Sequence, residues 1–427
     1  MSFNRFLLVL FFVFLFVEIS SADRYYYALR FWGSSLYTDN LYLTEDNKED
    51  DVNSNLGLSF SADKATRVSD LLFNYSLSRS FYWQNSDDSA FRHNLSLSYF
   101  RDLSKRLSVS LSSNYYRTEE SIEPNEQVFR ERRRSREPYY RFNGDFSLDY
   151  EYAKDSFFSA GLRLNYLQNE DPNIEDSRIY TEYFSLSKDF TWWFLKGELS
   201  FTQREFETER PVNTWGANIS LGYKLAHNKH ISFGASAERT QNIGPNEDDY
   251  WAYNFNISYA WQVTKTQAYH FSVGYYFRDS DMRGKENEGI TFSVDYSKKF
   301  KLTTFSVRGS GGYRYEYAEA QNTGFTEYYN ISFSLSRDLT RSLALTSSCF
   351  YRIEDFKQRE SGQEKTYGLS LGLQKQLTKR LSLSASYSYR KADSDLPGND
   401  YDVNSIFLSI NYLFWQAKEF PLKIFSL

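Results

Sequence analysis

The chain has 427 residues, of which 19% are aromatic, including 36 Tyr and 37 Phe, and its mean hydropathy is −0.62. A soluble core takes most of its apolar bulk from Leu, Ile and Val, so this composition argues against an ordinary soluble domain and favours membrane strands with aromatic girdles. The net charge of −5 gives no support to a nucleic-acid partner, and the single cysteine, Cys349, excludes a disulfide framework and a cysteine-based metal site.

The first 22 residues are predicted to be a secretory signal peptide. Arg5 precedes the apolar run of residues 6–17, and the small residues Ser20, Ser21 and Ala22 provide a cleavage site after Ala22. The apolar run is shorter than the roughly 20 residues that a membrane-spanning helix needs. An uncleaved anchor is therefore the weaker alternative.

From residue 73 to the end, apolar and polar residues alternate with a period of two, and helical periodicity hardly competes. In residues 381–390, Leu, Ala and Tyr occupy the odd positions, whereas Ser and finally Arg390 occupy the even ones. Residues 251–261 and 290–297 follow the same pattern. The alternation predicts strands with one apolar and one polar face.

A short polar turn recurs about every 37 residues, with clear examples at 102–105, 338–341 and 376–379. Turns are expected near positions 64, 103, 154, 190, 227, 264, 300, 339 and 378, and the widest gap contains the longest loop, residues 118–137. Each repeat holds two strands of about 14 residues, one tight turn and one longer charged loop. This asymmetry is typical of a transmembrane barrel, whereas a propeller blade needs four shorter strands.

Nine turns supply 18 strands, and the segments 24–37 and 402–415 add one each, which gives about 20 strands with a range of 18–22. In hydrocarbon every backbone N–H and C=O needs a partner, so such a sheet must close. The predicted fold class is all-β: one transmembrane antiparallel up-and-down β-barrel spanning residues 23–415 in the bacterial outer membrane. Its loops are expected to be extracellular and both its termini periplasmic. A soluble sandwich would show the same alternation and is the alternative.

The last predicted strand, with Ile406, Leu408, Ile410, Tyr412 and Phe414 on one face, resembles the terminal strand that the outer-membrane assembly machinery recognises. The chain continues beyond it, and the Phe-Pro pair at 420–421 is poor strand material. Residues 416–427 are therefore predicted to be a short periplasmic tail.

The longest predicted loop carries an arginine cluster interrupted by glutamates. It is a candidate for binding anionic groups, such as lipopolysaccharide phosphates, acidic polysaccharide or anionic solutes, or for folding into the barrel mouth as a constriction. The alternative is a solvated loop, although other loops are acidic and would attract it. The cluster comprises Arg130, Arg132, Arg133, Arg134 and Arg136.

The polar face of the predicted strands carries charges of both signs that are candidates for lining the lumen. These are Arg141, Asp145, Asp149, Arg163, Lys196, Glu198, Arg308, Arg314 and Glu316. For each of them, solvation or pairing on a wet wall is the simpler interpretation. The four histidines are dispersed and no serine lies in a nucleophile elbow, so no catalytic residue, metal site or cofactor is expected, and the chain is predicted not to be an enzyme.

Turns of the Asp-Leu-Thr-Lys-Arg type with flanking Leu-Ser-Leu-Ser strands occur in residues 95–107 and 369–383. In these features the mature chain resembles β-barrel porins associated with bacterial exopolysaccharide loci. The resemblance implies an outer-membrane channel linked to polysaccharide export.

The first predicted strand follows the signal peptide directly, which leaves no room for a plug domain and disfavours a gated siderophore receptor. A barrel of about 20 strands without a plug encloses water. We therefore predict a porin-like channel for passive diffusion or export of small or anionic solutes. The alternatives are a non-conducting scaffold or adhesion barrel and, more weakly, an outer-membrane hydrolase. Expected partners are outer-membrane lipids and lipopolysaccharide, the assembly machinery, and small solutes or polysaccharide, but no nucleic acid.

Overall fold

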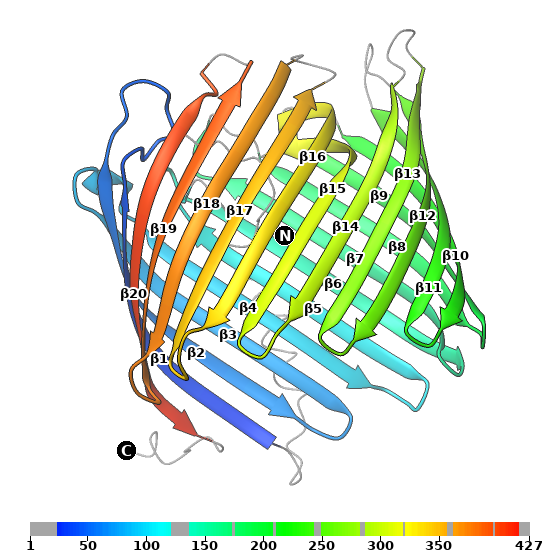
Figure 1. The fold of residues 1–427 in the computed structure, drawn as a ribbon, viewed down its shortest axis with the longest axis horizontal. Coiled ribbons are helices and arrows are strands. Elements are labelled where there is room, and N and C mark those ends of the chain that lie inside the picture. The colour runs from blue at the N-terminus through cyan, green and yellow to red at the C-terminus, as the bar shows by residue number, and fades with distance from the viewer. Residues whose placement is uncertain are drawn as a thin grey trace.

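The computed structural model describes residues 24–120, 136–172, 176–207, 211–242, 249–281, 287–318, 321–356, 362–395 and 398–417, and the side chains of 314–325 and of 417 are not described. Twenty strands form one sheet in which each strand pairs antiparallel with its sequence neighbours. The first strand also pairs with the last, so the sheet closes on itself (Figure 1). The predicted closed barrel of 20 strands is confirmed.

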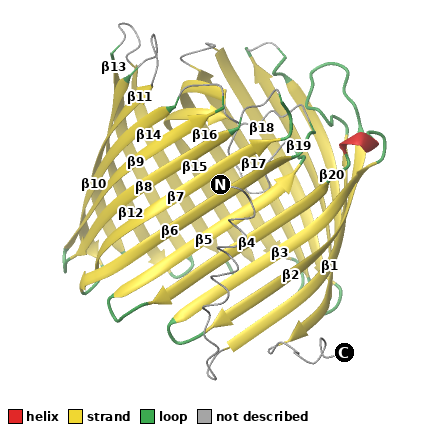
Figure 2. Ribbon diagram, turned by 180° about the vertical axis from the view of Figure 1, so that it is seen from behind, coloured by secondary structure: helices red, strands yellow, loops and turns green. Residues whose placement is uncertain are grey.

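The strands are β1 (Arg24–Thr38), β2 (Asp51–Ala65), β3 (Ser69–Tyr82), β4 (Phe91–Asp102), β5 (Leu107–Thr118), β6 (Tyr139–Ala153), β7 (Ser156–Asn169), β8 (Ser177–Asp189), β9 (Trp193–Phe206), β10 (Val212–Ala226), β11 (Lys229–Asn242), β12 (Tyr250–Thr264), β13 (Gln267–Ser280), β14 (Asn287–Lys299), β15 (Thr303–Ala318), β16 (Gln321–Asp338), β17 (Leu343–Phe356), β18 (Gly362–Gln376), β19 (Leu381–Ser394) and β20 (Tyr401–Ala417). One short 3-10 helix, η1 (Ser86–Asp88), lies in the β3–β4 loop and is red in Figure 2. No helix among the described residues is long and apolar enough to cross a membrane.

Nine turns of two to four residues join the strands at one end of the barrel, and longer connections join most of them at the other. Every predicted turn centre falls within these nine turns or within two residues of one. In several of these turns a Ser or Thr hydroxyl supplies a partner for backbone N–H groups. The Ser104 hydroxyl accepts hydrogen bonds from the backbone N–H of Arg106 at 3.2 Å and Leu107 at 3.1 Å. Thr378 does the same for Arg380 and Leu381, both at 3.1 Å.

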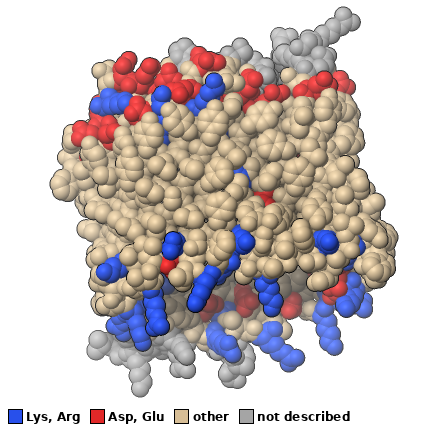
Figure 3. All heavy atoms as spheres, viewed as in Figure 1, with Lys and Arg blue, Asp and Glu red and all other residues tan. Residues whose placement is uncertain are grey.

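The outer face of the barrel is apolar. Phe184 is 53% exposed and Leu199 is 61% exposed, as expected for side chains that face lipid rather than a protein core. In the space-filling view a broad uncharged belt separates an acidic rim at the loop end from a basic rim at the turn end (Figure 3). This arrangement confirms that the apolar face of each strand points outward, which is the reverse of a soluble barrel.

Both ends of the barrel sequence lie at the turn end. Arg24 begins β1 opposite Ala65 of β2, and β20 ends where Ala417 pairs with Tyr27. Gln416 also belongs to β20, so this strand runs two residues past the predicted barrel end at 415. The predicted signal peptide and the tail beyond 417 lie outside the described residues.

Candidate functional site

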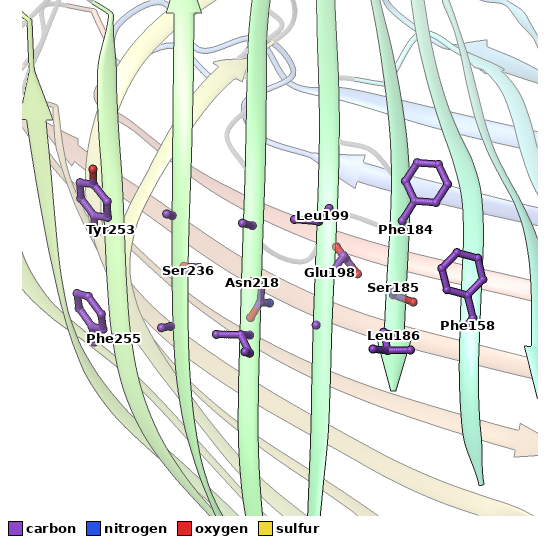
Figure 4. Close-up of a pocket in the computed structure, with 15 residues that line it drawn as sticks. Phe158, Phe184, Ser185, Leu186, Glu198, Leu199, Asn218, Ser236, Tyr253 and Phe255 are labelled. Carbon is purple, nitrogen blue, oxygen red and sulfur yellow. The ribbon is translucent and has the colours of Figure 1, made fainter. Parts of the chain in front are cut away.

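The inner face of the barrel wall is the polar one. In β8 to β11, Ser185, Glu198, Asn218 and Ser236 are in register across four neighbouring strands. Phe184 and Leu199 are the chain neighbours of Ser185 and Glu198, and they pair with each other on the outward face. Figure 4 shows this stretch of wall. Glu198 therefore lies on the face opposite the lipid-facing leucine, as expected for a lumen residue.

Three residues on β6, β7 and β8 form a compact group on the inner face. Arg163 and Asp145 are directly opposite each other, with 3.1 Å between Nε and Oδ2. The Arg163 guanidinium carbon lies 4.3 Å from the centre of the Tyr183 ring, and the Tyr183 hydroxyl is 3.5 Å from Asp145 Oδ1. The two predicted residues are thus paired, and their side chains remain 46% and 37% exposed. Such an exposed pair contributes little to stability.

The other predicted lumen residues do not form one site. Asp149 accepts hydrogen bonds from the hydroxyls of Ser147 and Ser159, Lys196 lies 5.7 Å from the Phe194 ring, and Arg308 is 3.6 Å from Asp295 on β14. Arg141 pairs in register with Leu167 and Tyr116, and these two neighbours are buried. The side chains of Arg314 and Glu316 lie outside the described residues. The predicted charges are therefore spread around the wall.

The β1–β2 loop, residues 39–50, folds against the inner face of the barrel. Leu41 is 2% exposed, and Leu43 packs with Ala392 of β19 and Tyr401 of β20. Asn40 is 1% exposed, and its side-chain amide donates to the backbone carbonyls of Thr44 at 2.7 Å and Asp402 at 2.9 Å. These bonds fix the loop to β20, the strand that closes the barrel.

Arg136 is the one member of the predicted arginine cluster whose position is described, because residues 121–135 are not. Its guanidinium donates to the backbone carbonyl of Leu41 and lies 5.9 Å from the ring of Tyr82. The Tyr42 hydroxyl donates to Asp88 at 2.8 Å. The β1–β2 loop thus contacts both the β3–β4 loop and the β5–β6 connection. We call residues 39–50, 83–90, 119–120 and 136–138 the loop cluster.

Two buried carboxylates hold the loop cluster together. Glu119 is fully buried, and both of its carboxylate oxygens accept a hydrogen bond from Arg92 Nε at 3.0 Å. Burial acts to raise the pKa of the Glu119 carboxyl, but the hydrogen bonds and positive charge of Arg92 outweigh it, so this pKa is lowered. At Asp88, in contrast, burial prevails over the hydrogen bond from Tyr42 and raises the pKa.

Asp51 is the second of these buried carboxylates and organises the start of the β3–β4 loop. It is fully buried, and its two oxygens accept hydrogen bonds from the backbone N–H of Trp83 at 3.0 Å, Gln84 at 3.1 Å and Asn85 at 3.0 Å. Its own neighbour Val52 donates a further backbone bond at 2.6 Å. Charge-assisted bonds of this kind are about twice as strong as neutral ones.

A cavity of about 690 Å³ lies beneath the loop cluster, against the inner wall from β14 to β20. Nine serine side chains line it, and it also contains Arg136, Arg308, Arg390, Glu120 and Asp295. Glu120 is bonded to Arg92 and Asp295 lies beside Arg308, so both carboxylates already face a cation. Arg390 lies 6.0 Å from the Phe350 ring and has no carboxylate partner among the described residues.

The sequence-based list of lumen residues omitted Arg390, Arg92 and Asp51. Arg390 was visible in the alternation, because it is the last even position of the run 381–390, whose odd positions are apolar. Arg92 follows the outward Phe91 in the same way. Asp51 offered no local signal, because the backbone groups that it binds lie more than 30 residues away.

Comparison with known proteins bears on the identity of this barrel. Residues 271–414, from β13 to β20, match the protein family described as "Putative beta-barrel porin 2". The resemblance to barrel porins is confirmed. The match covers the C-terminal third of the chain, including the wall that carries Arg308 and Arg390. The matched family is one of porins rather than enzymes, in agreement with the sequence prediction.

Solved structures resemble this barrel at very low sequence identity. The siderophore receptor PirA from Acinetobacter baumannii has a TM-score of 0.52 and 8% identity, over 93% of this chain and 81% of the receptor. A ferric enterobactin receptor of Pseudomonas aeruginosa, in complex with enterobactin, has a TM-score of 0.50 and 10% identity, over 91% and 81%. The Pseudomonas aeruginosa protein OpdK with vanillate has a TM-score of 0.46 and 9% identity, over 92% and 99%. No curated protein sequence matches the chain.

Proposed function

We propose that this barrel is a porin-like channel of the bacterial outer membrane for the passive movement of small hydrophilic solutes. The observation that carries the proposal is the serine-lined cavity beneath the loop cluster. A barrel that served only as a rigid scaffold would gain stability by filling this volume with apolar side chains. Here the wall instead presents hydroxyls and charges, which suit water and polar solutes. The match to a porin family over this wall supports the same function.

The charges of the cavity favour anions. Its two carboxylates are compensated by arginines, whereas Arg390 has no acidic partner among the described residues. Arg136 adds a second positive charge from the loop side, with its guanidinium bonded to a carbonyl rather than to a carboxylate. An entering anion therefore meets Arg390, which no described carboxylate neutralises, and Arg136, which also interacts electrostatically with the Asp88 carboxylate. The cluster at Arg130, Arg132, Arg133 and Arg134 would strengthen this preference if it lies at the mouth.

We further propose that the turns and both termini face the periplasm and that the longer loops face the exterior, where lipopolysaccharide surrounds them. In this orientation the terminal strand β20 is available to the assembly machinery. Serine hydroxyls both donate and accept hydrogen bonds, so the cavity wall offers suitable partners to the hydroxyls of sugars. This supports a role in the passage or export of saccharides, including acidic polysaccharide.

Conductance across a planar lipid bilayer tests the channel. The purified, folded chain is expected to produce discrete current steps and a reversal potential that favours anions in a salt gradient. Absence of current from protein that shows heat-dependent mobility on a denaturing gel would contradict the channel and support the scaffold. Deletion of residues 126–137 is expected to reduce the anion preference. An unchanged preference would remove the arginine cluster from the permeation path.

A further inference from the structure

The nine short turns form a basic rim that the channel function does not use. Together they contain nine Lys or Arg side chains and one carboxylate, Asp155. The cations are Arg67, Lys105, Arg106, Lys154, Lys265, Lys301, Arg341, Lys379 and Arg380. All nine are exposed, and no ion pair involves any of them among the described residues. We call this set the turn rim; on the face seen in Figure 3, Lys and Arg side chains gather along the turn end of the barrel.

The repeated turn motif fixes where these cations lie relative to the membrane. In the turn after β4, Leu103 is 52% exposed and precedes the basic pair by two residues. In the turn after β18, Leu377 is 45% exposed and again precedes a basic pair. The Ser or Thr between them turns its hydroxyl back to the backbone, as described above. Each motif therefore presents an apolar side chain next to the lipid-facing belt and cations immediately beyond it.

The opposite end of the barrel has the opposite charge. Its loops carry acidic stretches such as residues 45–51, and Figure 3 shows carboxylates concentrated there. Cations at that end are mostly engaged: Lys48 pairs with Asp402, and Lys391 pairs with Asp393 at 2.8 Å. The two ends of the barrel thus carry opposite charge, which the net charge of the chain does not reveal.

We infer that the turn rim binds the phosphate groups of anionic phospholipids in the membrane leaflet on the turn side. Lys and Arg beside an anionic lipid surface add favourable electrostatic energy, and the effect acts over about a Debye length, roughly 10 Å at 0.1 M salt. Phosphate oxygens are matched partners for guanidinium and ammonium donors. The exposed leucines hold the cations at headgroup depth, so lipid contact does not require a separate pocket. The inference is independent of whether the lumen conducts.

Native mass spectrometry of the full, folded chain in detergent tests this inference. The protein is mixed with equimolar phosphatidylglycerol and phosphatidylcholine at low ionic strength. We expect at least a threefold excess of bound phosphatidylglycerol, and the excess should decline as salt is raised. Equal binding of the two lipids would overturn the inference. Displacement of phosphatidylglycerol by a small amount of lipid A would also overturn it, because the rim would then prefer a lipid of the other leaflet.

Two variants that each lose four positive charges show which end of the barrel binds phosphatidylglycerol. Replacement of Lys105, Arg106, Lys379 and Arg380 by Gln is expected to remove most of the phosphatidylglycerol excess, because all four side chains are exposed and unpaired among the described residues. The control replaces Arg79, Arg178, Lys365 and Lys391, which lie near the loop end, by Gln. The control should retain the excess. Equal loss in both variants would show that binding follows net charge and would refute a site at the turn rim. Heat-dependent mobility establishes that each variant is folded.

Discussion

Removal of the Arg92 side chain is expected to loosen the loop cluster without opening the barrel wall. Arg92→Ala leaves the fully buried Glu119 carboxylate without its only described cationic hydrogen-bond donor. The contacts that remain include the Tyr82 hydroxyl, 3.3 Å from Oε1, and the Ser80 side chain. The backbone of β4 and its pairing with β3 and β5 are unaffected by this substitution.

The size of the effect has an upper bound that depends on pH. Breaking one partner from a buried ion pair costs about 3–5 kcal/mol. Glu119 can avoid part of this cost by binding a proton, and protonation of a carboxyl with an ordinary pKa of about 4.3 costs about 3.7 kcal/mol at pH 7 and about 1 kcal/mol at pH 5. The loop cluster is therefore destabilised by at most about 3.7 kcal/mol at pH 7, or about 500-fold in its opening equilibrium. The bound falls to roughly fivefold at pH 5.

Hydrogen exchange of the folded protein measures this opening directly. Amides of residues 83–90, which include the N–H bonded to Asp51, should lose protection by up to about 500-fold at pH 7 in Arg92→Ala, whereas amides in the centre of β4 should not change. Glu119→Gln added to Arg92→Ala removes the buried charge and should restore most of the protection. An effect of equal size at pH 5 and pH 7, or no rescue by Glu119→Gln, would refute the explanation through a buried charge.

The remaining predictions concern the second buried carboxylate, the cavity and acid. Asp51→Ala removes the acceptor of three loop N–H groups and should lower the opening free energy of residues 83–90, measured by hydrogen exchange, by about 2–4 kcal/mol. Asp51→Asn should lower this opening free energy by less. Arg390→Gln should lower the anion-to-cation permeability ratio about 1.5- to 3-fold at low salt, from a Coulomb energy of about 0.3–0.6 kcal/mol at 7 Å in water. Lys391→Gln, one residue away on the lipid face, should leave that ratio unchanged. The pKa of Glu119 is lowered in the folded state, so its charged form stabilises the loop cluster at pH values above the unfolded pKa. This stabilisation is lost as the pH falls through the folded pKa. Protection of the loop cluster should therefore decline on acidification below about pH 4.3.

The barrel wall was predictable because its signals are local. In turns such as 103–106 and 377–380, the hydroxyl of Ser104 or Thr378 and the apolar residue before it define the turn within five residues. The alternation between turns assigns the strand side chains to one face or the other. Strand pairing then follows from sequence order, because each strand pairs with the next. The same alternation predicts that Arg390 lies on the polar face, where the cavity is.

The loop cluster was not predictable because its contacts join distant parts of the chain. The Asn40 amide binds a carbonyl 362 residues away, and Arg136 binds a carbonyl 95 residues away. The acidic composition of residues 45–51 suggested an exposed loop, yet Leu41 and Leu43 bury the preceding part of the same loop against the wall. Two leucines in a short polar segment carry no periodicity, so sequence alone could not place them inside the barrel.

The central claim is that the barrel is a water-filled channel partly occupied by the β1–β2 loop, which packs against its inner wall, and single-channel conductance tests it most directly. Replacing residues 41–48 by a short Gly-Ser linker removes Leu41 and Leu43 from the lumen while keeping all twenty strands. The channel account predicts current from the wild-type chain and a larger unitary conductance from this variant at the same salt concentration. Absence of current from both folded proteins, or identical unitary conductance, would contradict it.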